Sequence, residues 1–312
     1  MQLTQKKSRR GDLLTAAAVA MLLEVMAALL YTGSLTRQVT NMLIPTAVYI
    51  VMAVSLNLVV GLLGELSLGH AGFMSVGLFS GCLVAIALTN TALPLMLRLP
   101  VSMLAGGLTA AVFGLLVGLP TLRLRGDYLA IVTLACGEII KNIITNLRVT
   151  GGALGLNTTA IYAGAKELLP YGAALVLLTV AVMLNLKRSK YGRAIMAIRD
   201  NRIAAFFAGC AGVLYGHSLA NIKAAAFDYN MSIEILVIVV LGGMGSVPGS
   251  VVSAIVLTVL PEALREVADY RMLVYAVVLI LVMQATNNPA IKRFFGAACK
   301  SLTPKRKERA AL

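Results

Sequence analysis

The sequence predicts an all-α, polytopic membrane protein with about 8–10 transmembrane helices and glycine-rich helix breaks. Hydrophobic residues make up 59% of the chain and charged residues 13%, and the mean hydropathy is +0.88. A soluble domain carries roughly a quarter charged residues, which it needs to cover its surface. Apolar runs long enough to cross a bilayer extend from one end of the chain to the other. Because lipid offers the backbone no hydrogen bonds, we expect these runs to be helices.

The predicted spans are apolar runs separated by short polar joints. A span needs about 20 apolar residues, or fewer where a helix is broken inside the protein. The first run follows a basic N-terminus but is longer than the apolar part of a signal peptide, so we expect it to remain as a span. The runs are 13–31, 42–63, 70–89, 101–119, 128–145, 168–186, 203–219, 232–243, 247–260 and 272–285.

The basic residues predict the topology. Nineteen of the 27 Lys and Arg residues fall in the stretches 6–10, 123–125, 187–202 and 292–309. Basic clusters beside apolar spans mark the cytoplasmic side of a membrane protein. Ten crossings that start inside place all four stretches on that side, so both termini are expected to be cytoplasmic. The net charge of +14 is therefore interpreted as a topology signal with lipid as its partner, not as a nucleic-acid surface.

Two glycine-rich stretches, Gly61–Gly72 and Leu241–Gly249, interrupt the apolar pattern. Paired breaks of this kind line the translocation route or a gate in many transporters. Alternatively, they are tight turns between spans, and their polar residues hydrogen-bond neighbouring helices. The candidate residues for a substrate path lie in or just before the first break. They are Asn57, Glu65, Ser67, His70 and Gly72.

Three GxxxG motifs occur in the predicted spans, at Gly77–Gly81, Gly114–Gly118 and Gly212–Gly216. Glycines at this spacing let helix backbones approach closely. We expect ordinary packing within the chain rather than a dedicated dimer face.

Glu138 and Lys141 are charged residues in an otherwise apolar segment. Residues three apart meet on one helix face, and pairing lowers the cost of holding each charge in the membrane. We predict a structural ion pair, with a substrate contact as the alternative.

The sequence contains no recognisable catalytic motif. The phosphate-binding pattern GxxxxGK[ST] is absent, so the chain is not expected to hydrolyse ATP. A run of intramembrane carboxylates for a proton relay is absent as well. The four cysteines and two histidines show no metal-ligand spacing, so neither a metal nor another cofactor is expected. If the protein drives uptake, the energy comes from another subunit.

The basic loop 187–202 also carries apolar residues. Tyr191, Ile195 and Ile198 fall on one face of a short helix. Such a helix docks a soluble partner or lies on anionic lipid. A plain topology signal would not need the apolar face.

Five runs together resemble the permease subunits of bacterial branched-chain amino-acid ABC transporters, and the M-type subunit is the closer match. They occur in family order between about residue 45 and residue 285. The runs are Gly64–Phe73, Leu122–Leu134, Thr150–Gly155, Ser189–Ala194 and Val240–Gly249.

The apolar runs predict a single permease domain at 1–290, and the charged C-terminus predicts a basic cytoplasmic tail at 291–312. The resemblance implies a heterodimer with a related permease in the bacterial inner membrane, two cytoplasmic ATPase subunits, and an extracytoplasmic substrate-binding protein that docks on loops 146–167 and 220–231. Leucine, isoleucine and valine would be the cargo. The matching ATPase-coupling residues would be Tyr191, Gly192, Arg193, Ile195 and Arg199.

Other functions are compatible with these observations. Related permeases carry urea, short amides or sugars. A stand-alone secondary carrier would depend on an ion gradient, and a membrane scaffold would not transport at all.

The chain departs from the family pattern after Arg193–Asp200. Family members continue into a coupling helix, whereas Ile203–Ala205 here runs almost directly into Phe206. About 20 residues of the family pattern are missing at this point, which shortens the following span to 203–219. Either a segment is lacking from this sequence or the ATPase contact is reduced.

Overall fold

The computed structural model describes residues 2–32, 36–64, 66–89, 94–121, 124, 126–189, 202–263, 277 and 280. The chain forms two compact units, Met1–Val259 and Leu260–Leu312, and the following description concerns the first. The predicted span 272–285 and the predicted boundary at residue 290 lie almost wholly outside the described residues.

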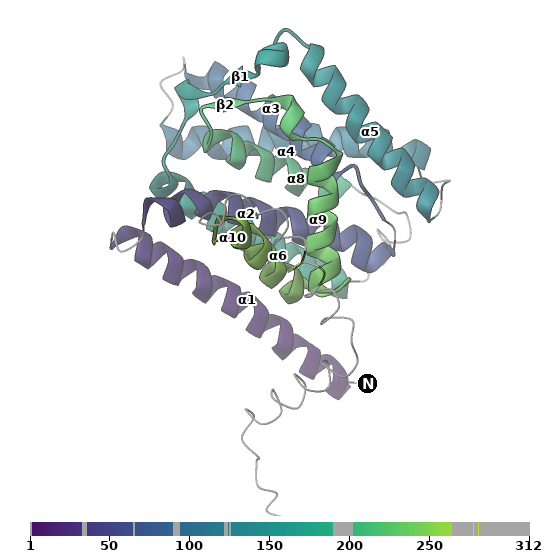
Figure 1. The fold of residues 1–312 in the computed structure, drawn as a ribbon. Helices are drawn as coiled ribbons and strands as arrows, with labels where there is room; N and C mark the ends of the chain where they lie inside the picture. The colour runs from purple at the N-terminus through teal and green to yellow at the C-terminus, as the bar shows by residue number, and fades with distance from the viewer. Residues whose placement is uncertain are drawn as a thin grey trace, which may run out of the picture. The chain divides into compact units, whose positions relative to one another are not determined.

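The described part of the chain is mostly α-helical, which confirms the predicted fold class (Figure 1). Among the described residues, six helices are long and apolar enough to cross a membrane, and two shorter apolar helices accompany them. Each predicted span before residue 272 overlaps one α-helix. The helices are α1 Gln2–Tyr31, α2 Arg37–Leu58, α3 His70–Thr89, α4 Leu95–Thr121, α5 Asp127–Asn146, α6 Ala165–Arg188, α8 Arg202–His217, α9 Tyr229–Gly242 and α10 Val247–Ala263.

Helices α3, α4 and α8 form one closely packed group, and α1, α2 and α6 form another (Figure 1). Glycines bring the first group together. A Cβ atom on Gly209 of α8 would lie 2.6 Å from the carbonyl oxygen of Gly106 in α4, and one on Gly77 of α3 would lie 2.8 Å from the carbonyl carbon of Gly209. The backbones therefore touch with no side chain between them.

The other GxxxG positions show the same pattern. A Cβ atom on Gly212 would lie 3.1 Å from Leu78 Cβ, and one on Gly81 would lie 2.8 Å from the Ser102 carbonyl oxygen. Packing within the chain is thus confirmed for the motifs of α3 and α8. Gly118 is different, because nothing lies within 4 Å of the Cβ position there.

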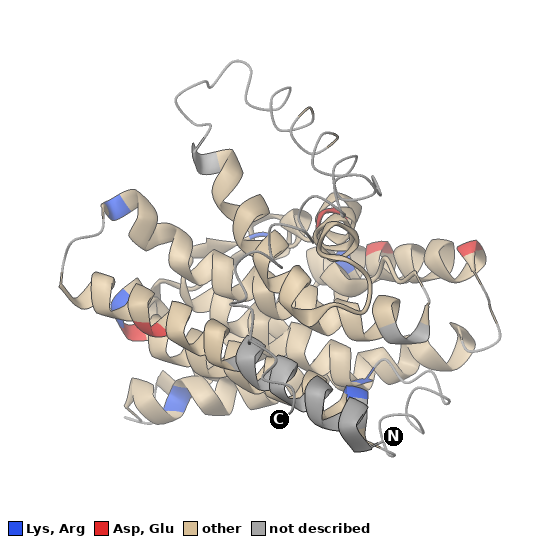
Figure 2. Cartoon of the chain, turned by 90° about the horizontal axis from the view of Figure 1, so that it is seen from below, with Lys and Arg blue, Asp and Glu red and all other residues tan. Residues whose placement is uncertain are grey.

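Helix α2 occupies the core of the first unit. Every residue from Ile50 to Val60 is buried, as expected of a helix that is apolar on all sides. Helices α4 and α5 are instead mostly exposed, with apolar side chains such as Leu108 and Ile139 on the surface. Figure 2 shows how few acidic and basic residues interrupt the helices. Such an apolar exterior suits a lipid environment or neighbouring membrane helices.

A small antiparallel sheet ties two loops together. Strand β1, Leu156–Asn157, pairs with β2, Asn221–Ile222. Short helical turns flank the strands, at Gly152–Leu154, Thr159–Ile161 and Ala224–Ala226. The sheet joins the two loops predicted to lie outside, 146–167 and 220–231, and no pattern in the sequence predicted this pairing.

Candidate functional site

The first glycine break is a non-helical segment inside the bundle. Helix α2 continues into a π-helical turn, Val59–Leu63, which ends at Gly64 with a left-handed φ of +68°. The next helix begins at His70, and Ser67, which lies between Gly64 and His70, is buried. Non-helical backbone at membrane depth is tolerated only where protein or a cavity surrounds it. The break therefore runs from an exposed turn at Gly64 to buried backbone at Ser67.

The backbone of this segment packs against helix α5. The Leu68 amide donates to Thr133 Oγ1 at 3.1 Å. A Cβ atom on Gly69 would lie 2.6 Å from the Thr133 carbonyl oxygen, so the close approach requires glycine. Gly72 serves the same contact one turn later, since its Cβ position lies 2.9 Å from Gly137 Cα. Gly72, predicted as a path residue, is therefore a packing position between α3 and α5.

Buried hydrogen bonds of His70 and Ala71 join the start of α3 to two other helices. The Nε2 atom of His70 lies 2.9 Å from Ser55 Oγ of α2, and only 2% of the His70 surface is exposed. The next amide, of Ala71, donates to Ser232 Oγ of α9 at 3.3 Å. This is the helix-joining role that polar residues commonly have in membrane bundles. Whether His70 also contacts cargo stays a prediction.

The second glycine break separates α9 from α10. Gly243 and Gly245 have left-handed φ angles of +88° and +81°. Gly242 and Gly249 bring the two helices into backbone contact, because a Cβ atom on Gly242 would lie 2.5 Å from the Ser250 amide nitrogen. Only glycine fits both the φ angles and the close approach.

Asn57 links the two breaks. Its Oδ1 atom accepts a hydrogen bond from the Gly245 amide at 2.7 Å, and its Nδ2 donates to Ser250 Oγ at 2.8 Å. Lys187, at the end of α6, donates from Nζ to the Gly245 carbonyl oxygen at 2.6 Å. Residues almost two hundred positions apart in the chain therefore meet at the end of the bundle where α2 and α6 end and α10 begins.

A cavity of about 240 Å³ lies along α2 on the other side of Ser55. Glu234 Oε2 accepts a hydrogen bond from the Tyr49 hydroxyl at 3.3 Å across it. Of the predicted path residues, the four that the structure describes, Asn57, Ser67, His70 and Gly72, do not line this cavity. The sequence signal for it was a single acid, Glu234, in an apolar run. The lining residues are Tyr49, Tyr215, Ala226, Phe227, Asp228, Asn230, Met231 and Glu234.

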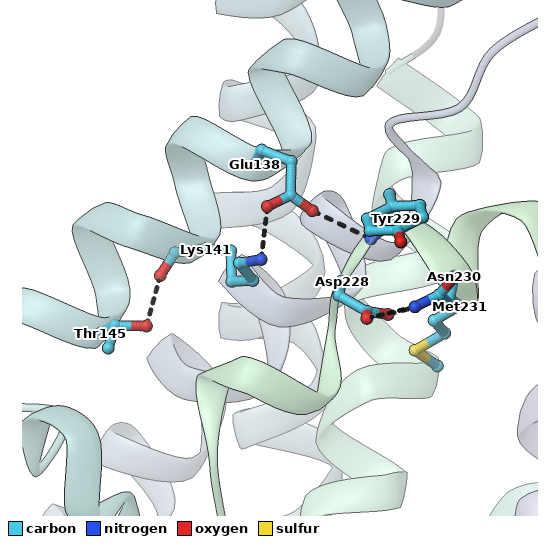
Figure 3. A network of polar contacts seen from close by, with 7 residues as sticks. All are labelled: Glu138, Lys141, Thr145, Asp228, Tyr229, Asn230 and Met231. Carbon is cyan, nitrogen blue, oxygen red and sulfur yellow. Dashed lines mark hydrogen bonds and ion pairs between the residues drawn. The ribbon is translucent and has the colours of Figure 1, made fainter.

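Asp228 shapes one wall of this cavity as the N-cap of α9 (Figure 3). Its two carboxylate oxygens accept hydrogen bonds from the Met231 amide at 3.2 Å and from Asn230 Nδ2 at 2.8 Å. A capping carboxylate of this kind satisfies an amide that has no partner within the helix. The Phe227 ring packs edge-on against Phe79 and Tyr215, which fixes the start of the loop.

Glu138 and Lys141 form the ion pair that the sequence predicts (Figure 3). The second Glu138 oxygen, Oε1, accepts a hydrogen bond from the Tyr229 amide at 2.9 Å. The pair thus fastens α5 to the first turn of α9. That this role is structural, rather than a contact with cargo, stays a prediction.

Several predicted residues lie outside the described part of the chain. Glu65 belongs to the first break, and the other five form the predicted ATPase-coupling loop. These five are Tyr191, Gly192, Arg193, Ile195 and Arg199.

The family model described as "Branched-chain amino acid transport system / permease component" matches residues 38–210 and 203–283. The chain belongs to this family. Together with six apolar helices of membrane-spanning length, this identifies a multi-pass membrane protein and confirms the resemblance drawn from the sequence. No solved structure matches the chain.

The curated relatives are M-type permeases. The chain is 34% identical over 290 residues to the high-affinity branched-chain amino acid transport system permease protein LivM of Escherichia coli K12, and 33% identical over 296 residues to LivM of Salmonella typhimurium LT2. It is 28% identical over 193 residues to a probable LivM of Methanocaldococcus jannaschii, covering 52% of this chain and 56% of that protein. The first two alignments cover 76% of this chain and 66% of each relative, so the match spans just under two thirds of their length.

The same alignments bear on the expected departure near Ile203. The alignment with the Escherichia coli protein is 290 positions long but includes only 76% of the 312 residues. It therefore contains positions at which the relative has a residue and this chain has none. The family model also matches in two pieces that meet at 203–210. Both observations agree with the departure from the family pattern that the sequence predicts near Ile203.

Proposed function

We propose that this chain is the M-type permease subunit of an ATP-driven importer in a bacterial inner membrane, and that branched-chain or other apolar amino acids pass through it. The observation that carries the proposal is the family match over residues 38–283, together with relatives named for branched-chain amino-acid transport. The chain itself supplies the conduit, and partner subunits hydrolyse ATP.

The geometry supports a route along α2. At one end of the route lies the cavity with Tyr49 and Glu234, beside the loop that begins α9. At the other end lie the two glycine breaks that Asn57 joins. Between them α2 is buried on all sides, so the described helices hold this route closed.

The contacts at Gly245 have the properties of a gate. Interhelical hydrogen bonds in membranes are worth about 0.6 kcal/mol on average and up to about 1.7 kcal/mol. The two bonds of Asn57 therefore hold the breaks together with roughly 1–3 kcal/mol. This is strong enough to bias the closed state and weak enough for ATP-driven subunits to overcome.

The ATPase subunits would act through loop 187–202. Lys187, the first residue of this loop, bonds directly to Gly245 of the second break. Displacement of the loop by a cytoplasmic partner would consequently pull on the gate. At the opposite end, β1 and β2 hold loops 146–167 and 220–231 as one surface on which a substrate-binding protein would dock.

Co-purification tests the assembly. The chain should be isolated from its native membrane with a tag and its companions identified by mass spectrometry. The proposal expects a related permease, two copies of an ATPase subunit and, on addition of cargo, a substrate-binding protein. A chain that is isolated alone and transports on an ion gradient would instead be a secondary carrier.

A further inference from the structure

The cavity between α2, α8 and the start of α9 has a size suited to a small metabolite. Its volume is about 240 Å³. A site needs about 10–15 Å³ of such space to hold one water molecule, so this cavity has room for a ligand of several non-hydrogen atoms.

The charge of the cavity selects for a cation. Of its lining residues Asp228 and Glu234 are carboxylates, and within the described part of the chain no Lys, Arg or His lines it. The hydroxyls of Tyr49 and Tyr215 add polar groups beside Glu234. An ammonium group placed here meets oppositely charged oxygens and aromatic faces, both of which attract cations.

The two carboxylates differ in what they can offer a ligand. Asp228 is engaged by the Met231 amide and the Asn230 side chain as the cap of α9. Glu234 has one donor among the described residues, the Tyr49 hydroxyl, at a long 3.3 Å. A carboxylate has about four lone-pair sites, so most of the accepting capacity of Glu234 is unused. Acids inside a membrane span are costly, and a cationic ligand would offset that cost.

The remaining wall is apolar. Phe227 is buried and held by its edge-on contacts with Phe79 and Tyr215. Met231 lines the cavity together with Phe227. A fixed aromatic ring next to a flexible thioether can accommodate aliphatic side chains of different branching.

We propose that this cavity binds α-amino acids, with Glu234 accepting hydrogen bonds from the ligand's ammonium group while Phe227 and Met231 contact its apolar side chain. The identification of the ligand as the transported cargo rests on the function proposed above. The binding step itself does not require ATP or a partner subunit.

Binding of radiolabelled leucine to the full chain in detergent, purified with whichever subunits accompany it, tests the proposal. Two competitors separate the contributions of the ligand's groups. Leucinamide keeps the ammonium group and lacks the carboxylate, whereas 4-methylpentanoate keeps the carboxylate and side chain and lacks the ammonium group. Leucinamide should compete and 4-methylpentanoate should not.

Substitutions assign the effect to Glu234. Glu234→Gln keeps the shape and the Tyr49 contact but removes the charge, and it should weaken binding by roughly tenfold to a hundredfold. Glu234→Asp should retain part of the affinity. Glu24→Gln is the matched control, because Glu24 is an exposed acid of α1 and lies outside the cavity. Its binding should equal that of the unmodified chain.

The outcomes separate this inference from the proposed function. Absence of leucine binding, equal competition by 4-methylpentanoate, or unchanged binding by Glu234→Gln would overturn the cavity assignment, even if the assembled complex transports leucine. Glu234-dependent binding would support the cavity assignment. If an assembled complex then failed to take up leucine, the proposed function would fail while the binding site remained.

Discussion

Substitution of Gly77 by alanine places a methyl group where α3 and α8 touch. The added Cβ atom would lie 2.8 Å from the carbonyl carbon of Gly209 and 2.9 Å from its carbonyl oxygen. Ordinary van der Waals contact begins near 3.5 Å. Because the obstructing atoms are backbone, no side-chain rotation relieves the collision, and the helices must separate.

The magnitude follows from the cost of overpacking. Extra atoms in a well-packed core cost about 1–3 kcal/mol, and more where the obstruction is rigid. Separating α3 from α8 also weakens the contact with Gly106 in α4, and a gap of about 0.5–1 Å forfeits a quarter to a half of each contact's dispersion energy. We therefore expect Gly77→Ala to lose about 3 kcal/mol. Gly118→Ala in α4 should be neutral or stabilise by up to about 1 kcal/mol, since nothing lies near its Cβ position.

A thiol-reactive dye measures the difference in detergent-purified protein. Cys82 and Cys210 are buried and become reactive only when the helices open. At roughly 2–4 °C per kcal/mol, Gly77→Ala should lower the apparent melting temperature by about 6–12 °C. Equal melting temperatures for Gly77→Ala and Gly118→Ala would refute the backbone contact between α3 and α8.

Two further predictions concern charged residues. Glu138→Ala removes the acceptor of the Tyr229 amide and leaves Lys141 unpaired, so it should destabilise the protein by about 1–2 kcal/mol. The ratio of leucine uptake to valine uptake should stay unchanged. A shifted ratio at normal expression would make Glu138 a cargo contact. Lys187→Met breaks the bond to the Gly245 carbonyl and should lower uptake per ATP several-fold with an unchanged melting temperature. Arg37→Met is the control, because Arg37 is an exposed basic residue at the start of α2 outside both docking loops, and it should behave as the unmodified chain. Equal uptake per ATP in both variants would show that the bond of Lys187 to Gly245 does not contribute to the proposed gate.

Local patterns made the helices predictable. Each span is encoded by a continuous apolar run, and the breaks are encoded by glycines that supply left-handed φ angles at Gly64, Gly243 and Gly245. The ion pair was equally local, because Glu138 and Lys141 lie three residues apart on one helix.

Contacts between distant segments had no such signal. Tyr49 and Glu234 meet across 185 residues, and Asn57 and Gly245 across 188. The residues next to each partner give no indication of which distant residue it contacts. The cavity and the proposed gate could therefore be found only from the way α2 packs against α8, α9 and the α9–α10 break. The position of His70 beside the break was visible in the sequence, but its buried hydrogen bond to Ser55, which depends on how α2 and α3 pack, was not.

Energised uptake in a reconstituted system tests the central claim most directly. The chain and its co-purified partners should be placed in lipid vesicles with the substrate-binding protein outside and ATP inside, and the accumulation of labelled leucine should be followed over time. The account predicts accumulation that requires ATP and every partner. Accumulation by this chain alone, or none by the complete assembly, would contradict it.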